Sequence, residues 1–220
     1  MKEIIVAPSI LSANFLDLKN DLDITEKSLA KWLHFDVMDG HFVPNISFGS
    51  AILRQVKGYS KLFMDVHIMI SDPLKYAKEF IDAGADILTF HYEALKSDEE
   101  ILQVIKLIKS NNCKVGISIK PDTKVEKIFK YLNMLDLVLI MSVEPGFGGQ
   151  SFMDNSLNKI KELRLEIDSN KYNCLIQVDG GINDITSYKC RNAGADVLVA
   201  GSYLYGKIDF SSRVKKLMGI

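Results

Sequence analysis

Two histidines and two aspartates lie near the ends of three apolar segments, where their side chains could act together. His34 and Asp36 lie two residues apart in the first segment, His67 lies in the second, and Asp179 ends the third. Taken singly, each has an ordinary structural explanation, but four together favour a shared site. Two imidazole nitrogens and two carboxylate oxygens suit a divalent cation such as zinc, iron, manganese or cobalt. We therefore predict one metal site formed by these residues. Asp65, which lies in register with His67, could be a deeper polar partner that orients the metal-ligating ring.

Glycine-rich turns follow three later apolar segments and predict a phosphate site. Gly146, Phe147, Gly148 and Gly149 lie in the first turn, Gly180 and Gly181 in the second, and Gly201 and Ser202 in the third. Glycine lets backbone N–H groups surround an anion, and nearby helix N-termini add favourable dipoles. One such turn would indicate only a tight bend, whereas three favour phosphate binding. The segment His41–Asn45 could cover the site, and Lys120–Thr123 is explained by a turn alone.

These residues need a scaffold that brings the ends of several strands together. Short β-branched apolar runs recur along the chain, and most are near-continuous, which is typical of a parallel sheet. The runs are Ile4–Ala7, Trp32–Val37, Leu62–Ile68, Ile87–His91, Val115–Ile119, Leu137–Val143, Leu175–Val178 and Val197–Ala200. Eight strands without a linker between them predict an α/β fold, a single-domain (β/α)₈ TIM barrel over residues 1–220. A doubly wound open sheet is the alternative.

Helical periodicity separates these strands, so we expect a helix after each one. Apolar residues recur at helical spacing between Phe15 and Ile24, between Ile101 and Ile108, and between Leu157 and Ile167. A further helix would begin at Pro73 and end at Gly84. Asp154 and Asp184 are the predicted N-caps of two later helices.

The composition limits the kind of partner. The chain has 220 residues, of which 47% are hydrophobic, and 27 Lys and Arg nearly balance 28 Asp and Glu. Such a chain has a large core, but its net charge provides no general attraction for nucleic acid or an anionic membrane. No apolar run is long enough to span a bilayer, and Pro8 interrupts the first one before a signal-peptide core forms. We therefore predict a cytoplasmic protein with reduced cysteines and without nucleic-acid or membrane partners. We also expect a homo-oligomer, although none of these composition figures bears on it.

Five stretches closely resemble the ribulose-phosphate 3-epimerase family. They are Ala7–Ser12, His34–Asn45, Asp65–Met69, Met141–Gln150 and Val178–Ile182, and the similarity extends from about Ile5 to Gly206. The resemblance implies a barrel of the ribulose-phosphate-binding type. It also implies an isomerase of the pentose phosphate pathway that interconverts D-ribulose 5-phosphate and D-xylulose 5-phosphate, with one divalent metal ion per subunit.

The resemblance further implies roles for particular residues. His34, Asp36, His67 and Asp179 match the metal ligands, and Asp36 and Asp179 match the two catalytic acid/base residues. Ser9 and His67 match positions that contact substrate. The substrate and phosphate cradle matches Gly146, Phe147, Gly148, Gly149, Gly180, Gly181, Ile182, Gly201 and Ser202. Asn14, Ile68 and Ser151 depart from residues common in the family, and none belongs to the expected chemistry.

Two aspartates suit an epimerisation next to a ketone. A proton must leave the carbon from one face, and a proton must return to the other face. Two carboxyl groups meet this need when one is a carboxylate and the other a carboxylic acid. Asp36 and Asp179 could flank a substrate over a metal ion that stabilises the enediolate intermediate as a Lewis acid. A phosphate cradle would hold the reacting carbon between them.

Other activities fit parts of this pattern. An epimerase acting on D-allulose 6-phosphate would share most of these residues, although Gly148–Gln150 and Asp179–Gly181 look more like the pentose enzyme. A barrel decarboxylase or aldolase would need a catalytic lysine, for which Lys120 is the candidate. A non-catalytic barrel that binds metal and phosphate would tolerate loss of one carboxylate, and both are present.

Overall fold

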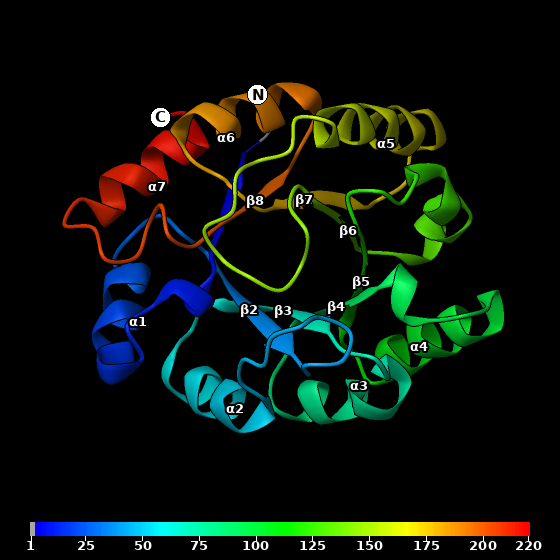
Figure 1. The fold of residues 1–220 in the computed structure, drawn as a ribbon, viewed down its shortest axis with the longest axis horizontal. Helices are drawn as coiled ribbons and strands as arrows, with labels where there is room; N and C mark the ends of the chain where they lie inside the picture. The colour runs from blue at the N-terminus through cyan, green and yellow to red at the C-terminus, as the bar shows by residue number, and fades with distance from the viewer. Residues whose placement is uncertain (1–2) are drawn as a thin grey trace.

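The computed structural model describes residues 3–220, and its eight strands form a nearly closed parallel barrel inside a ring of helices (Figure 1). The strands are β1 (Ile5–Pro8), β2 (Trp32–Met38), β3 (Phe63–Met69), β4 (Ile87–His91), β5 (Lys114–Ile119), β6 (Leu137–Met141), β7 (Leu175–Asp179) and β8 (Val197–Ala200). Every predicted strand is present, with its ends within two residues of the predicted range. The (β/α)₈ barrel is therefore confirmed, and the open sheet is wrong.

The barrel closes between β1 and β2 at the level of the candidate site. The other neighbouring strands form parallel ladders, from β1 with β8 round to β3 with β2. Within residues 3–220, β1 and β2 are joined by an isolated bridge between Ser9, directly after β1, and His34. The Ser9 hydroxyl also donates a 2.6 Å hydrogen bond to Asp36. The closure therefore positions two residues of β2 that the sequence singles out.

Helices fill the connections and pack round the barrel. The α-helices are α1 (Leu18–Glu26), α2 (Ser50–Tyr59), α3 (Pro73–Asp82), α4 (Asp98–Ser110), α5 (Ser156–Asn170), α6 (Asp184–Ala193) and α7 (Phe210–Met218). The 3₁₀ helices are η1 (Ile10–Ser12), η2 (Phe15–Asp17), η3 (Tyr92–Ala94) and η4 (Val125–Met134). The helix after β5 is thus η4 instead of an α-helix. Its buried residues Val125, Ile128 and Tyr131 recur every three residues, the period of a 3₁₀ helix, so the tighter winding keeps all three on one buried face.

Both predicted N-caps are wrong by one residue. Asn155 precedes α5 in place of Asp154. Asn183 caps α6 in place of Asp184, and its side chain accepts hydrogen bonds from two backbone N–H groups, including that of Thr186. An amide oxygen serves this role as well as a carboxylate does, so two adjacent candidates cannot be separated by residue type.

Apolar packing occurs on both sides of the strands. Outward-facing strand residues such as Phe35 and Val66 belong to the main core, together with residues of the surrounding helices. Inside the barrel, β1, β6 and β8 contribute a second apolar cluster that includes Ala7, Leu139 and Val199. The other half of the interior holds the buried polar residues His34, Asp36, Asp65, His67, Thr89, His91, Ser118 and Gln177. Because buried polar groups are costly unless paired, this half of the interior indicates a functional site.

Among residues 3–220, no helix combines the length and the apolar character needed to cross a membrane. Cys113, Cys174 and Cys190 are buried free thiols. Burial raises the pKa of each thiol to about 12, so none of them is a reactive nucleophile near neutral pH.

Candidate active site

The four predicted metal ligands converge at the mouth of the barrel. His34 and Asp36 lie on β2, His67 lies on β3, and Asp179 ends β7. One candidate ligand atom from each residue lies within 4.8 Å of the others. The first three side chains are buried, whereas Asp179 is partly exposed. This group of nitrogen and oxygen atoms could hold a metal ion.

Asp36 lies between the two histidines of the group. Its Oδ1 atom is 3.1 Å from Nε2 of His34 and 3.2 Å from Nδ1 of His67. Its Oδ2 atom accepts the hydrogen bond from Ser9. Both oxygens of Asp36 are therefore fixed, one towards the histidines and the other towards the start of η1.

Asp65 holds His34 from the opposite side of the ring. It accepts a 2.7 Å hydrogen bond from Nδ1 of His34 and another from the Gln177 amide. Nε2 is then the ring nitrogen that faces Asp36 and is available to a cation. Burial would lower the pKa of His34, but the carboxylates of Asp36 and Asp65 outweigh it and raise that pKa well above its usual value. The site thus attracts positive charge, and its donor atoms fit a divalent cation.

The two catalytic candidates differ in their affinity for a proton. Burial would raise the pKa of Asp36, but His34 and His67 outweigh it and hold that pKa well below its usual range. Burial, together with the negative charge of Asp36, raises the pKa of Asp179 to about 7. Near neutral pH the site without metal therefore contains one carboxylate and one carboxyl group close to its midpoint.

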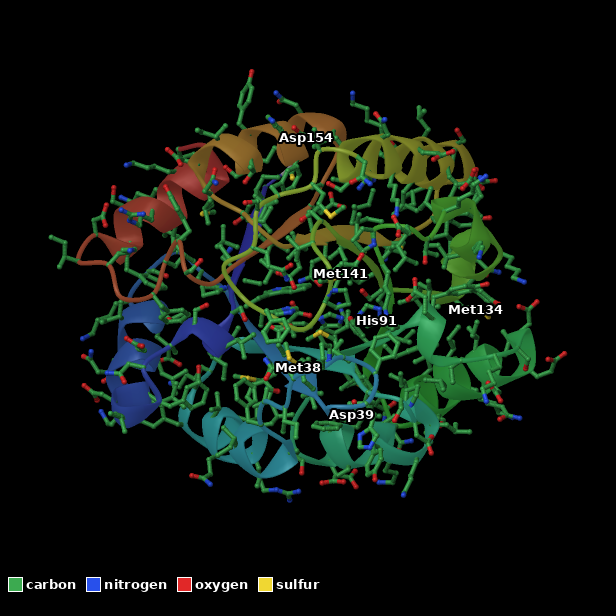
Figure 2. All side chains as sticks on the ribbon, viewed as in Figure 1. Met38, Asp39, His91, Met134, Met141 and Asp154 are labelled. Carbon is green, nitrogen blue, oxygen red and sulfur yellow. The ribbon has the colours of Figure 1, made fainter. Side chains whose placement is uncertain are left out.

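The sequence analysis missed two further groups behind His67, the buried His91 and the partly buried Glu93. Nε2 of His67 lies 2.9 Å from Nε2 of His91, whose Nδ1 lies 3.2 Å from the Glu93 carboxylate. Figure 2 shows His91 and Met141 near the middle of the view, inside the ring of helices. Burial lowers the pKa of His91 to about 4 despite Glu93, so its ring is neutral. His91 could have been predicted as a site residue, because it is a polar residue at the end of β4 and the other polar strand ends line the same interior.

A pocket of about 620 Å³ opens beside the cluster. It is lined by both catalytic candidates, Asp36 and Asp179, and by the predicted substrate residues Ser9, Gly146, Phe147, Gly148, Gly149, Gly180, Gly181, Ile182, Gly201 and Ser202. His34 and His67 are fully buried and are not among its lining residues. Lys207 and Arg213 also line it, although the sequence analysis did not single them out. Both follow the glycine turn after β8, which is the signal that could have indicated them.

Two connections meet over the barrel mouth. The loop between β6 and α5, yellow-green in Figure 1, crosses the middle of the view. The Asn45 side chain, in the loop after β2, donates a 2.8 Å hydrogen bond to the carbonyl of Gly146. The segment His41–Asn45 is therefore tied to the glycine loop that lines the pocket.

We predict that the metal-free protein loses stability as the pH rises from about 6.5 to 8. The pKa of Asp179 is about 7 in the folded state, against 3.8 as the ordinary value, and the pKa of His34 is also raised. Over this interval the folded protein holds protons that the unfolded chain has already lost. The pKa values of His67 and His91 are lowered, so these two groups make the stability rise with pH. They do so only below the ordinary histidine pKa of about 6.5, outside this interval.

Urea unfolding of chelator-treated protein at several pH values measures this dependence. Asp179→Asn should show a shallower decline than the parent protein, since one of the protons is no longer involved. An equal or steeper decline in the variant would contradict the assignment of the raised pKa to Asp179.

The fold and the site together define a class. A parallel barrel with a cluster of carboxylates and imidazoles at its strand ends, next to a glycine-lined pocket, is the arrangement of a (β/α)₈-barrel enzyme. The profile of the ribulose-phosphate 3 epimerase family matches residues 5–205, and the chain belongs to that family.

Named relatives cover nearly the whole chain. The ribulose-phosphate 3-epimerase of Bacillus subtilis is 46% identical over 215 residues, which are 97% of this chain and 98% of the relative. The chloroplastic ribulose-5-phosphate-3-epimerase of Arabidopsis thaliana is 43% identical over 97% of this chain and 75% of the relative.

Solved structures of lower identity share the fold. A 3-hexulose-6-phosphate synthase superposes with a TM-score of 0.63 at 20% identity, covering 99% of this chain and 98% of that one. A mutant tryptophan synthase α-subunit from Pyrococcus furiosus gives a TM-score of 0.71 at 13% identity, with the same coverage. At 20% and 13% identity, these superpositions show a shared barrel fold and carry no information on function.

Proposed function

We propose that this protein is a ribulose-phosphate 3-epimerase that interconverts D-ribulose 5-phosphate and D-xylulose 5-phosphate. The observation that carries the proposal is the placement of two carboxyl groups on one pocket. Asp36 reaches it from β2 and Asp179 from β7, two strands that are not neighbours in the barrel. Family membership and the names of the relatives support the same substrate.

The two aspartates would move the proton at C3. With Asp36 as the carboxylate, it removes the proton from one face, and Asp179 as the acid returns a proton to the other face. Ser9 holds Asp36 in place through its hydrogen bond of 2.6 Å. The reverse reaction exchanges the two roles, as the chemistry of a reversible epimerisation requires.

We propose that His34, Asp36, His67 and Asp179 hold one divalent metal ion per subunit, either zinc, iron, manganese or cobalt. A bound cation would supply a Lewis acid that stabilises the negative charge on the substrate oxygens after C3 loses its proton. Asp65 orients His34 so that Nε2 faces the other ligands. Elemental analysis of protein purified without added metal identifies the ion.

The glycine turns would hold the phosphate and so position C3 between the aspartates. Gly180 and Gly181 have φ angles of +116° and +61°, and a Cβ atom on Gly181 would lie 2.5 Å from the backbone nitrogen of Phe152. A side chain is therefore excluded at this point for two reasons. Lys207 and Arg213 also line the pocket and add positively charged side chains to it.

Gly181→Ala should destabilise the protein more than the matched variant Gly149→Ala. Gly149 also has a positive φ, +75°, but its added Cβ would meet no atom within 4 Å. Gly149→Ala should thus cost about 1–2 kcal/mol from backbone conformation, while Gly181→Ala adds a clash. Urea unfolding measures both, and equal losses would show that close packing at Gly181 is unimportant.

A coupled assay separates this function from its alternatives. The protein should form xylulose 5-phosphate from ribulose 5-phosphate, lose that activity with a chelator, and show little activity on D-allulose 6-phosphate. Preference for the six-carbon substrate would favour the sibling epimerase, and inactivity on both would favour a non-catalytic barrel.

Lys120 stacks on Phe42 with its Nζ atom 4.3 Å from the ring centre and is not a lining residue of the pocket, which disfavours a lysine-dependent reaction.

We propose further that the protein acts in the cytoplasm as a homo-oligomer, without nucleic-acid or membrane partners. The balanced charge supports the absence of polyanionic partners. Leu16 and Ile46 are 99% and 75% exposed, and burial of these apolar side chains between subunits would be favourable. Sedimentation velocity measures the assembly, and a monomer at micromolar concentration would contradict it.

A further inference from the structure

A chain of hydrogen bonds runs from the buried His67 and His91 to the partly buried Glu93, away from the proposed metal site. It passes from His67 to His91 and then to Glu93, through contacts of 2.9 and 3.2 Å. The second carboxylate oxygen of Glu93 accepts hydrogen bonds from the backbone N–H of Lys120, at 2.8 Å, and from the Thr123 hydroxyl. The epimerisation proposed above does not use His91 or Glu93.

The direction of each bond follows from the chemistry of Glu93. A carboxylate only accepts, so His91 donates from Nδ1. A neutral imidazole carries one N–H, which leaves Nε2 of His91 as an acceptor. In this arrangement His67 donates from its own Nε2. Its other nitrogen, Nδ1, then carries the lone pair that a metal ion would take, and without a metal ion the Asp36 carboxylate, 3.2 Å away, competes for a proton on that nitrogen.

We propose that Glu93 is a positioning residue that sets, through His91, the tautomer in which His67 presents the lone pair of Nδ1 to the metal site. The effect on metal binding rests on the proposed function, whereas the tautomer is a property of the chain itself. A ligating histidine needs a fixed acceptor for its other N–H, and His91 can act as that acceptor only while Glu93 accepts from it.

The surroundings of Glu93 are built to hold it. Nζ of Lys159, on α5, donates to the backbone carbonyls of Lys120 at 3.0 Å, Pro121, and Thr123 at 2.6 Å. The segment Lys120–Thr123 is therefore more than a turn, because it is anchored to a helix and supplies two donors to one carboxylate oxygen. These donors fix which oxygen of Glu93 faces His91.

Glu93→Gln should reverse this chain of bonds. The amide oxygen would remain with the Lys120 N–H, which can only donate, so the amide NH₂ would face His91. Nδ1 of His91 would then accept, its Nε2 would carry the proton, and Nε2 of His67 would have to accept. The proton of His67 would move to Nδ1 and occupy the position needed for a metal ion.

Glu26→Gln is the matched control. Glu26 also accepts a backbone N–H and a hydroxyl through one carboxylate oxygen, from Lys61 and Ser60, each at 2.7 Å. It contacts no histidine in these bonds. The same change of charge and the same loss of an acceptor are therefore made away from the site.

Nitrogen-15 NMR of histidine-labelled protein reads the tautomer directly, and the chain has only 4 histidines to assign. In metal-free parent protein and in Glu26→Gln, His67 should be protonated on Nε2, and in Glu93→Gln on Nδ1. Zinc titration against a chromophoric chelator should show affinity about 10- to 100-fold weaker for Glu93→Gln alone.

The two readouts separate the possible failures. A parent protein with His67 protonated on Nδ1 would overturn the proposal even if Glu93→Gln did not fold. An unchanged tautomer in Glu93→Gln, or equal weakening of zinc binding by the two glutamine variants, would also overturn it. Absence of zinc binding by the parent protein, with the expected tautomers, would instead contradict the proposed metal site.

Discussion

Asp179→Asn is expected to lower kcat for the conversion of ribulose 5-phosphate to xylulose 5-phosphate by at least about 100-fold, and Asp36→Asn by a similar factor. An asparagine keeps the size of the side chain but neither removes nor donates the C3 proton. Because each aspartate serves a different face of the substrate, the remaining one cannot complete the inversion alone. The variants are compared at saturating metal concentration, since both side chains are also proposed metal ligands.

Hydrogen exchange distinguishes loss of one base from general damage. Each variant should still exchange the C3 proton of one epimer with solvent, and the two variants should act on opposite epimers. Asp154→Asn is a suitable control, because Asp154 is exposed and pairs with Lys189 at 2.8 Å outside the pocket. Turnover close to that of the parent protein in either Asp36→Asn or Asp179→Asn would refute the assignment of two acid/base residues.

Removal of the metal ion is the second change with a large expected effect. A bound cation contributes several kcal/mol of charge stabilisation, so a fully chelated protein should lose activity by about 1000-fold or more. Addition of a divalent ion should restore it, and His34→Gln should require a higher metal concentration for the same activity. Circular dichroism before and after chelation checks that the barrel is intact.

The chelated protein must also be shown by elemental analysis to lack metal. Full activity under that condition would mean that the aspartates act without a cation. The cluster of His34, Asp36, His67 and Asp179 would then have to stabilise charge through its own protons.

Most of the barrel could be predicted from sequence because parallel strands are buried on both faces. Their apolar runs, such as Ile87–His91 and Val197–Ala200, match the observed strands to the residue. The convergence of His34, Asp36, His67 and Asp179 was predictable for a related reason, since strand ends in a barrel meet at one mouth. Helix details were less predictable, because Asp154 and Asn155 suit an N-cap equally well.

The partners of the site residues could not be predicted in the same way. Asp65 accepts a hydrogen bond from His34 because the register between β2 and β3 pairs these two residues across neighbouring strands. Glu93 reaches the site only through His91, and it is held by the loop after β5. Such links join residues from different strands by distance and angle, which neither periodicity nor residue type reveals. Arg213 comes after the glycine turn that follows β8, and its place in the pocket lining depends on the path of the chain there.

Epimerisation in deuterium oxide tests the two-carboxylate account most directly. At low conversion of ribulose 5-phosphate by metal-loaded protein, the xylulose 5-phosphate formed should carry deuterium at C3, while the remaining ribulose 5-phosphate should retain hydrogen. This asymmetry arises because one aspartate removes the substrate proton and the other delivers a proton exchanged with solvent. Product that keeps the original hydrogen at C3, or no conversion at all, would contradict the account.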